Sequence, residues 1–478
     1  MKKLFFATLA LAATHVVMAD PTDNSSSTPV IVNPNSVYID RQAYIQDPYA
    51  GLPSGGGTQN VSESQLSNQN IWQKWFSDGT YNVMAMGAYN TNNGYPNTSY
   101  SANIFAQTGQ VGGFSFGGLL TVANLFGAPY TTPYQSQQMQ FLPVAQISQP
   151  TELFAEYQYQ NIVQVDVGRI GINNSPWLSS AYYNNMQAPG MTYQGGLINV
   201  NPGGGWLLTG IAFNQAMPVG TNGFNSYTLY NSNFDYGTGT ANLINDQTAG
   251  TMAVGGNYIG DDNNYNLRLW AYQFENYADL AYADNSLKIP VSKALTFNLA
   301  AQAGYEQGTN NNIISTNSDG SINATFFGAQ AGFNYNWFGL ALAMNSVMGS
   351  SNNYLGGAII SPYTYEMATD PLYTTSYMAG MVEKAAGSAF KITPSFSFMD
   401  NNLVFAPSVA YYSTVAIPSS QEYDMIITYN VPQVKGLLFT LDGAYLNQAL
   451  YNNPFPNNGG GVVGGNVYTV QIGGSYLY

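Results

Sequence analysis

The last thirteen residues of the chain, 466–478, alternate between apolar and polar side chains. One face would carry Tyr468, Val470, Ile472, Gly474, Tyr476 and Tyr478, and the other Thr469, Gln471, Gly473 and Ser475. A period of two predicts a β-strand with one apolar and one polar face. No stretch beyond the N-terminal region approaches the ~18 continuous apolar residues of a membrane-spanning helix. If the chain crosses a membrane, it must therefore do so as a closed barrel, the one sheet that satisfies all its own backbone groups.

The same stretch fits the pattern polar-x-Gly-x-x-aromatic-x-aromatic through Gln471, Gly473, Tyr476 and Tyr478. The pattern resembles the terminal signal by which outer-membrane barrels are recognised for assembly. It implies the barrel assembly machinery and outer-membrane lipids as partners. The alternative is an edge strand of a soluble sheet, but a bare apolar edge at a chain end promotes aggregation. We therefore expect a protein of the outer membrane of a Gram-negative bacterium.

The N-terminal region has the three parts of a secretory signal peptide. Residues 1–3 are basic, residues 4–13 are apolar, and residues 17–19 form a small-residue cleavage site. This predicts a signal peptide over 1–19. Residues 20–78 are rich in Pro, Ser, Thr, Asn and Gly around one short helical pattern. We expect them to form a partly disordered periplasmic segment or a plug, with a simple tether as the alternative, and residues 79–478 to form the barrel.

Composition excludes several functions. The chain has no cysteine, and its one histidine, His15, lies in the predicted signal peptide. Zinc sites of the usual kind, Ser-His-Asp triads and cysteine nucleophiles are thus ruled out, and we expect no enzymatic activity, no cofactor and no metal site. Without Lys2 and Lys3, nine basic residues remain against 25 acidic ones, a net charge of −16. Nucleic-acid binding needs a basic surface, so we expect no nucleic-acid partner.

Short alternating segments recur from residue 80 onward. We expect nineteen candidate strands, near 80–90, 99–107, 112–125, 150–160, 162–171, 191–200, 205–214, 250–259, 264–275, 277–289, 294–306, 322–335, 338–347, 375–383, 388–398, 403–413, 421–430, 435–447 and 466–478. Bacterial single-chain barrels have an even number of strands, which favours 16 to 18 strands, with 18 preferred. The connections alternate between tight turns and long loops. The sequence therefore predicts an all-β, antiparallel transmembrane barrel with short periplasmic turns and long extracellular loops.

Charged residues on the predicted strands are expected to face the lumen, because charge on the lipid face is costly. Glu152 and Glu156, for example, share a face with Gln158, while Leu153 and Ala155 lie on the opposite one. The pore-lining candidates are Glu152, Glu156, Asp166, Arg169, Arg268, Asp279 and Asp442. The alternative for each is a solvated charge without a special role. Together they predict a polar, net-acidic lumen.

Two segments of the chain resemble the OprD-type specific porins and the related LbtU-type siderophore porins. The first has a strand ending in Gly-Arg, a Pro-containing loop, then Met-x-x-Pro and a strand opening on aromatic-x-Gly. Its matching positions are Gly168, Arg169, Pro176, Trp177, Met186, Pro189, Tyr193 and Gly195. The second is a Trp/Tyr strand, a turn and a returning strand over 269–282, which lead into a Pro-x-x-x-x-Leu-x-Phe segment from Pro290.

The resemblance implies an outer-membrane porin that passes small solutes and performs no covalent chemistry. Two alternatives are a siderophore (ferric iron) uptake barrel and a non-conducting surface adhesion barrel with Tyr- and Asn-rich loops. The expected ligand is accordingly a small-molecule solute, with a siderophore as the alternative. The chain departs from the family at Asn185, where the family usually has Arg, and nine basic residues form only a thin basic ladder. We therefore expect cations to be preferred over anions.

Overall fold

The computed structural model describes most of the chain from residue 76 onward. It covers residue 76 and residues 79–92, 95–126, 146–160, 162–172, 174–178, 191–217, 223–226, 248–260, 264–309, 321–361, 370–377, 379–382, 385–415, 419–434, 437–448, 451–452, 462–463 and 466–477. The predicted signal peptide and nearly all of the predicted N-terminal segment lie outside the described residues. No helix among the described residues is long and apolar enough to cross a membrane.

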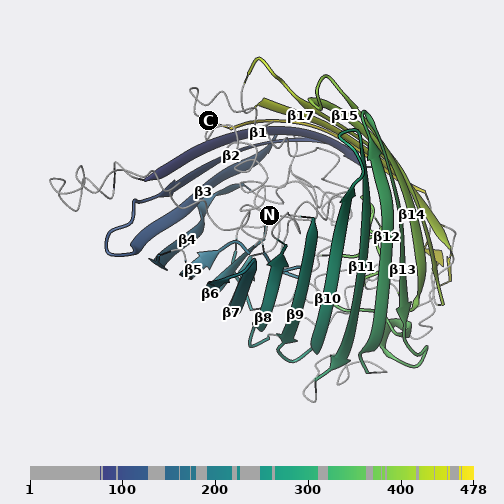
Figure 1. Ribbon diagram of the computed structural model, residues 1–478, viewed down its shortest axis with the longest axis horizontal. Coiled ribbons are helices and arrows are strands. Elements are labelled where there is room, and N and C mark those ends of the chain that lie inside the picture. The colour runs from purple at the N-terminus through teal and green to yellow at the C-terminus, as the bar shows by residue number, and fades with distance from the viewer. Residues whose placement is uncertain are drawn as a thin grey trace.

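Eighteen long strands form one antiparallel sheet (Figure 1). The first nine are β1 (Thr80–Asn92), β2 (Tyr95–Gln107), β3 (Phe114–Phe126), β4 (Ile147–Tyr159), β5 (Val163–Ile170), β6 (Thr192–Gly203), β7 (Trp206–Met217), β8 (Thr251–Ile259) and β9 (Tyr265–Phe274). The others are β10 (Ala278–Pro290), β11 (Leu295–Gly308), β12 (Asn323–Tyr335), β13 (Phe338–Met348), β14 (Gly387–Phe398), β15 (Leu403–Thr414), β16 (Ser420–Asn430), β17 (Leu437–Gln448) and β20 (Val467–Leu477). A 3-10 turn, η5 (Tyr354–Gly356), and a small hairpin of β18 (Tyr451–Asn452) and β19 (Val462–Val463) complete the described elements.

The sheet closes on itself, because β1 pairs with β2 on one side and with β20 on the other. Each other long strand pairs with its sequence neighbours, so the wall is an up-and-down barrel. This confirms the predicted fold class and the preferred count of 18 strands. The first residue of β1 and the last residue of β20 lie at the same end of the barrel, which is the end that carries short connections such as the one between β12 and β13. In outer-membrane barrels the short connections are periplasmic.

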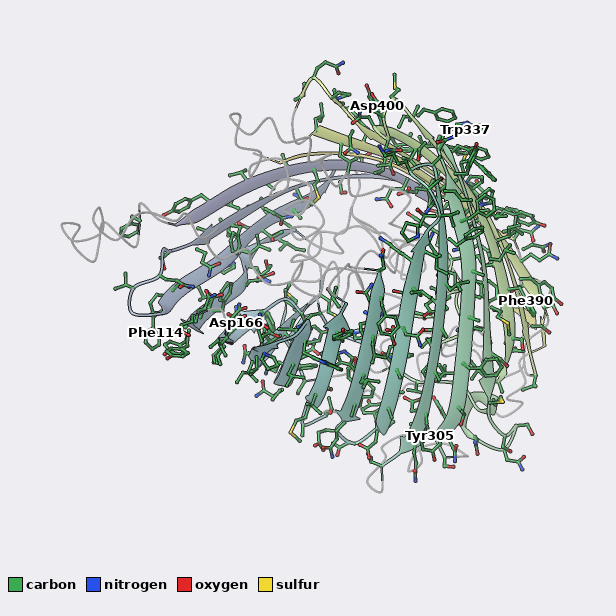
Figure 2. The ribbon with its side chains drawn as sticks, in the orientation of Figure 1. Phe114, Asp166, Tyr305, Trp337, Phe390 and Asp400 are labelled. Atoms are coloured by element: carbon green, nitrogen blue, oxygen red, sulfur yellow. The ribbon has the colours of Figure 1, made fainter. Side chains whose placement is uncertain are left out.

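Side chains alternate between the two faces along each strand. On β9, for example, exposed and buried positions alternate almost without interruption. The outer face carries large apolar side chains, and Tyr305, Trp337 and Phe390 project from it in Figure 2. The inner face buries polar residues, among them Thr469 and Gln471 on β20. Apolar-out and polar-in is the pattern of a barrel that faces lipid outside and water inside.

Aromatic residues form a belt near each end of the outer face. Trp337 stacks near Phe396 at a centroid distance of 6.0 Å, and Phe396 lies 5.8 Å from Phe405, all near the periplasmic end. Near the other end the belt is made of tyrosines, such as Tyr423 and Tyr445 with a centroid distance of 6.3 Å. Phe405 and its counterpart in the upper belt, Tyr411, are separated by about 20 Å along β15 at the usual rise per residue. The two belts therefore flank the apolar band of the outer face, which is the arrangement found in outer-membrane barrels.

Glycines on the inner face make room for aromatic rings from the neighbouring strand. A Cβ added to Gly304 on β11 would lie 2.2 Å from the ring of Phe326 on β12. The Trp270 ring covers Gly255 in the same way, with a distance of 2.1 Å. Because no other residue leaves this space, these glycines let large rings lie flat against the wall.

Candidate solute pathway

A network of carboxylates and amides lines the inner face of β2 to β5. Glu156 on β4 lies directly opposite Asp166 on β5, and both are almost completely buried. Gln164 bridges them, because its Nε2 donates to Glu156 Oε2 at 2.9 Å and to Asp166 Oδ2 at 3.1 Å. Glu156 Oε1 also accepts from Gln107 Nε2 and Ser115 Oγ, both at 3.1 Å. Neutral donors thus hold two neighbouring carboxylates in place.

An ion pair occupies the inner face of β9 and β10. Arg268 Nε donates to Asp284 Oδ1 at 2.9 Å and to Oδ2 at 3.1 Å, and Nη2 contacts Oδ2 as well. The Tyr282 hydroxyl donates to Asp284 Oδ2 at 2.6 Å and accepts from the side-chain amide of Gln302 on β11 at 2.9 Å. Arg268 is 3% exposed and Asp284 is 1% exposed. The pair is therefore shielded from bulk solvent and held by the neighbouring strands.

A second acidic group lies on β16 and β17. Asp424 Oδ2 accepts from Ser408 Oγ at 2.8 Å and lies 3.9 Å from the Lys391 ammonium. Asp442 on β17 also faces inward and is 7% exposed. Glu422 on β16 is fully buried. This wall thus carries three carboxylates and one lysine.

The connection between β5 and β6 folds against the inner wall. Asn174 Nδ2 donates to Asn199 Oδ1 at 3.0 Å on β6 and to Thr209 Oγ1 at 2.8 Å on β7. Further along, Trp177 is fully buried and packs edge-on against Phe326 of β12 with a centroid distance of 5.7 Å. The described part of this connection therefore spans the inner face from β6 to β12.

The connection between β13 and β14 also enters the barrel and reaches its far side. Ile360 N donates to Glu306 Oε2 on β11 at 2.7 Å, which ties the connection to the near wall. The Tyr377 hydroxyl donates to Gln471 Oε1 on β20 at 2.7 Å. Since β14 to β17 separate β13 from β20 in the wall, this bond reaches well around the interior.

The two inserted connections pack in one apolar cluster. Trp177 and Leu178 belong to it from the first connection, and Ile359, Ile360 and Leu372 from the second. All five side chains are essentially inaccessible. The two connections therefore fill part of the interior beside the polar wall residues described above.

The predicted pore-lining residues fall into two groups. Glu152, Glu156, Asp166, Arg268 and Asp442 are buried on the inner side of their strands. Arg169 is half-buried, lies opposite the outward-facing Leu153 in the sheet register, and stacks on the Phe224 ring at 4.6 Å. Asp279 is exposed on the outer face, because Leu280 and Tyr282 occupy the inner positions of β10.

Sequence reasoning missed several buried charges on the inner side. They are Asp284, Glu306, Asp370, Lys391, Glu422 and Asp424. For the residues on strands, the alternation of side chains could have identified them. Asp284, for example, lies two positions after Tyr282 and therefore on the same face of β10. Asp370 lies in an inserted connection, where no periodicity points to it. Among the described residues, no group of three or more Asp, Glu or His side chains is arranged to hold a metal ion.

The predicted assembly signal lies on the closing strand. Gln471 is fully buried and faces inward, and Gly473 lies on the same face. Tyr476 pairs with Ala85 of β1 and Leu437 of β17 through its backbone. Tyr478 lies outside the described residues. The recognition role of these four residues stays a prediction.

The sequence matches no family model and has no significant match among curated proteins. Solved structures do match. The barrel superimposes on OccK8 (OprE) of Pseudomonas aeruginosa with a TM-score of 0.66 and 12% identity, over 84% of this chain and 99% of that one. The fold is that of the OprD-type porins. OpdK of P. aeruginosa with vanillate (TM-score 0.65, 12% identity, 84% and 99% of the two chains) is similar, as is OccK2 (OpdF) of P. aeruginosa with glucuronate (0.63, 13%, 85% and 99%). The predicted resemblance to the OprD-type porins is thus confirmed at the level of the fold.

Proposed function

We propose that the barrel lets small solutes cross the outer membrane and that it favours cationic and neutral solutes over anions. The proposal combines the porin fold with the chemistry of the inner side. The fold supports a passage through the lumen. The side chains that border this passage decide which solutes enter.

The observation that carries the charge preference is an excess of buried carboxylates. Nine acidic residues are buried in the described part of the chain, namely Glu152, Glu156, Asp166, Asp284, Glu306, Asp370, Glu422, Asp424 and Asp442. The buried basic residues there are two, Arg268 and Lys391, and each lies beside one of these acids. Walls of low dielectric constant concentrate the field of uncompensated charges, so cations accumulate in such a passage and anions are depleted.

This preference would differ from that of the similar structures. OpdK was solved with vanillate and OccK2 with glucuronate, both of which carry a carboxylate at neutral pH. A cluster such as Glu156 and Asp166 would repel a carboxylate. We therefore infer that the same fold admits oppositely charged solutes according to the side chains on its inner wall.

The reversal potential in a planar bilayer tests the proposal directly. In a tenfold KCl gradient, the current through the wild-type channel should reverse at a potential with the sign of a cation-selective channel. Complete selectivity for cations would give about 59 mV. Replacing Glu156→Gln and Asp166→Asn together should move the reversal potential toward zero. Asp400→Asn, which removes one exposed carboxylate from the β14–β15 turn, is the control and should leave it unchanged.

Three results would contradict the proposal. A reversal potential on the anion side would show that Arg268 and Lys391 dominate the passage. An equal shift from the Asp400→Asn control would mean that surface charge, not the inner wall, sets the preference. A folded barrel that never conducts would favour the adhesion alternative.

A further inference from the structure

Two carboxylates lie close together on the inner face of β16 and β17. Asp442 on β17 lies opposite Ile426 on β16, and Asp424 lies two residues before Ile426. Both aspartate side chains point inward. The two residues are therefore diagonal neighbours, whose Cα atoms lie about 7–8 Å apart. Two aspartate side chains at this separation can hold a single donor group between them.

The negative charge of the Asp424–Asp442 pair is only partly balanced. Lys391 on β14 lies 3.9 Å from Asp424 Oδ2, and its Nζ also donates to the backbone oxygen of Thr375 at 2.9 Å. Asp442 makes no ion pair and no hydrogen bond with any described residue. Because it is 7% exposed, solvent in the lumen still reaches it. One carboxylate of the pair thus faces the lumen without a counter-charge from the described wall.

Buried hydrogen-bonding atoms beside the pair also lack partners. Asp424 Oδ2 accepts from Ser408, but Oδ1 is buried and has no partner in the part of the chain that the structure describes. The Thr440 hydroxyl, one inward position from Asp442 toward the periplasmic end, is more than nine-tenths buried and is unpaired in the same way. Buried polar atoms are almost always paired. Unpaired atoms gathered in one place therefore indicate a partner that the chain itself does not supply.

The chemistry of these groups selects a ligand that is positively charged and donates hydrogen bonds. An ionised carboxylate only accepts hydrogen bonds, whereas a primary ammonium group carries N–H donors and no acceptor. A calcium ion takes about six to eight oxygen ligands, more than two carboxylates and one hydroxyl provide. An organic ammonium group therefore fits the pair better than a calcium ion does.

The pair lies next to the point at which the connection between β13 and β14 meets the far wall. The Tyr377 hydroxyl of that connection donates to Gln471 on β20, and Gln471 lies directly opposite Asp442. The flanking inner positions include the small residues Ala444 and Gly473. A solute that moves along this wall therefore meets Asp442 where the inserted connection is anchored.

We propose that Asp424 and Asp442 bind the primary ammonium group of an organic cation as it crosses the barrel. One N–H group donates to Asp442 and another to Asp424 Oδ1, while the Thr440 hydroxyl pairs with a polar group further along the solute. The site rests on the proposed function, because it requires a lumen that admits cations. A quaternary ammonium ion has the same charge but no N–H group, so it should bind much more weakly.

Block of the single-channel current in planar bilayers tests this site. The purified barrel conducts KCl, and n-butylammonium or tetramethylammonium is added to one side. We expect butylammonium to interrupt the wild-type current at lower concentrations than tetramethylammonium. Asp442→Asn should raise the apparent Kd of butylammonium about tenfold, because one charge-assisted hydrogen bond is lost. Asp442→Glu keeps the carboxylate and should retain most of the block.

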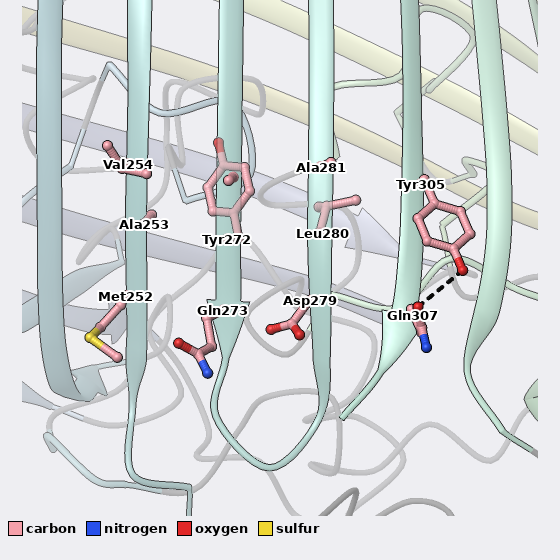
Figure 3. Close-up of a pocket in the computed structure, with 11 residues that line it drawn as sticks. Met252, Ala253, Val254, Tyr272, Gln273, Asp279, Leu280, Ala281, Tyr305 and Gln307 are labelled. Carbon is pink, nitrogen blue, oxygen red and sulfur yellow. Dashed lines mark hydrogen bonds between the residues drawn. The ribbon is translucent and has the colours of Figure 1, made fainter. Parts of the chain in front are cut away.

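Two further variants separate a site from the general field of the lumen. Asp279→Asn removes a carboxylate from the outer face of β10, where Asp279 lies beside Gln273 in Figure 3, and should leave the block unchanged. Asp166→Asn removes a carboxylate from the inner face of β5 and should weaken the block less than Asp442→Asn does. Heat-modifiable mobility on a gel verifies that each variant is folded. The comparison of the two probes on the wild type depends on no variant.

Equal effects of Asp166→Asn and Asp442→Asn would overturn the site, because the acidic field of the whole lumen would then explain the block. Equal block by the two probes would exclude N–H donation as its basis. A channel that is cation-selective in a KCl gradient but is not blocked by butylammonium would reject the site and leave the proposed function intact. An anion-selective reversal potential would instead reject the proposed function itself.

Discussion

Removing Arg268 should destabilise the barrel, because its partner Asp284 would remain as a buried charge. In Arg268→Leu, Asp284 keeps only the Tyr282 hydroxyl, at 2.6 Å, among the contacts described above. Breaking a buried pair from one side costs about 3–5 kcal/mol, and the remaining hydrogen bond favours the lower end of that range. The single variant should therefore lose about 3 kcal/mol of the free energy of unfolding.

The double variant Arg268→Leu/Asp284→Leu should be much closer to the wild type. Replacing a buried ion pair by apolar side chains is often neutral, and here the Tyr282 hydroxyl loses its acceptor Asp284 but still accepts from the Gln302 amide at 2.9 Å. The expected loss is about 1 kcal/mol, the usual net contribution of one hydrogen bond. The double variant should thus be more stable than Arg268→Leu alone by about 2 kcal/mol.

Equilibrium urea unfolding of the barrel in lipid vesicles, followed by tryptophan fluorescence, measures these differences. Lys293→Leu removes an exposed charge from the β10–β11 turn and should change stability by less than about 0.5 kcal/mol. Equal stability of Arg268→Leu and the wild type would mean that water solvates Asp284 in the lumen. A double variant that loses as much as the two single variants together would show that the two side chains are not coupled.

Three further predictions follow from other parts of the barrel. Gly304→Ala should lower the free energy of unfolding by about 1–3 kcal/mol, because the new Cβ would lie 2.2 Å from the Phe326 ring. In the same urea assay, combining it with Phe326→Leu should recover part of the loss. Tyr377→Phe removes the hydroxyl that donates to Gln471, so single-channel recordings should show a larger or noisier conductance, and unchanged traces would contradict a narrowing role. Tyr478→Asp should impair assembly into the outer membrane, and a normal yield of heat-modifiable barrel would refute the terminal signal.

The wall of the barrel could be predicted from the sequence because lipid on one side and polar surroundings on the other impose a period of two. Eighteen of the nineteen candidate strands correspond to observed strands. The exception is the segment 375–383, whose described residues form no strand. Tyr377, Met381 and Val382 are apolar there because they pack inside the barrel, as part of the connection between β13 and β14. Apolar composition alone does not distinguish a lipid-facing strand from a loop buried in the interior.

The inner-side residues were harder to predict, since the rule that charge points inward has exceptions near the ends of strands. Asp279 lies close to the extracellular end of β10, where an outward carboxylate costs little. Its face is therefore decided by its neighbour Leu280, which points inward, and not by its charge. Asp424 and Lys391 lie on strands whose alternation is regular, and their inward positions follow from it. The contacts between the inserted connections and the wall depend on loop conformation, which the period of a strand does not encode.

The hydrogen bond between Tyr377 and Gln471 links the narrowing of the channel to the last step of its construction. Gln471 belongs to β20, the strand that joins β17 to β1 and so completes the ring. Until that strand is in place, Tyr377 lacks this acceptor, and the inserted connection lacks its anchor on the far side. Tyr412 of β15 and Glu306 of β11 already hold the same connection before the ring is complete. Closing the seam between β17 and β1 therefore adds the last strand of the wall and, in the same step, one further contact that fixes the inserted connection.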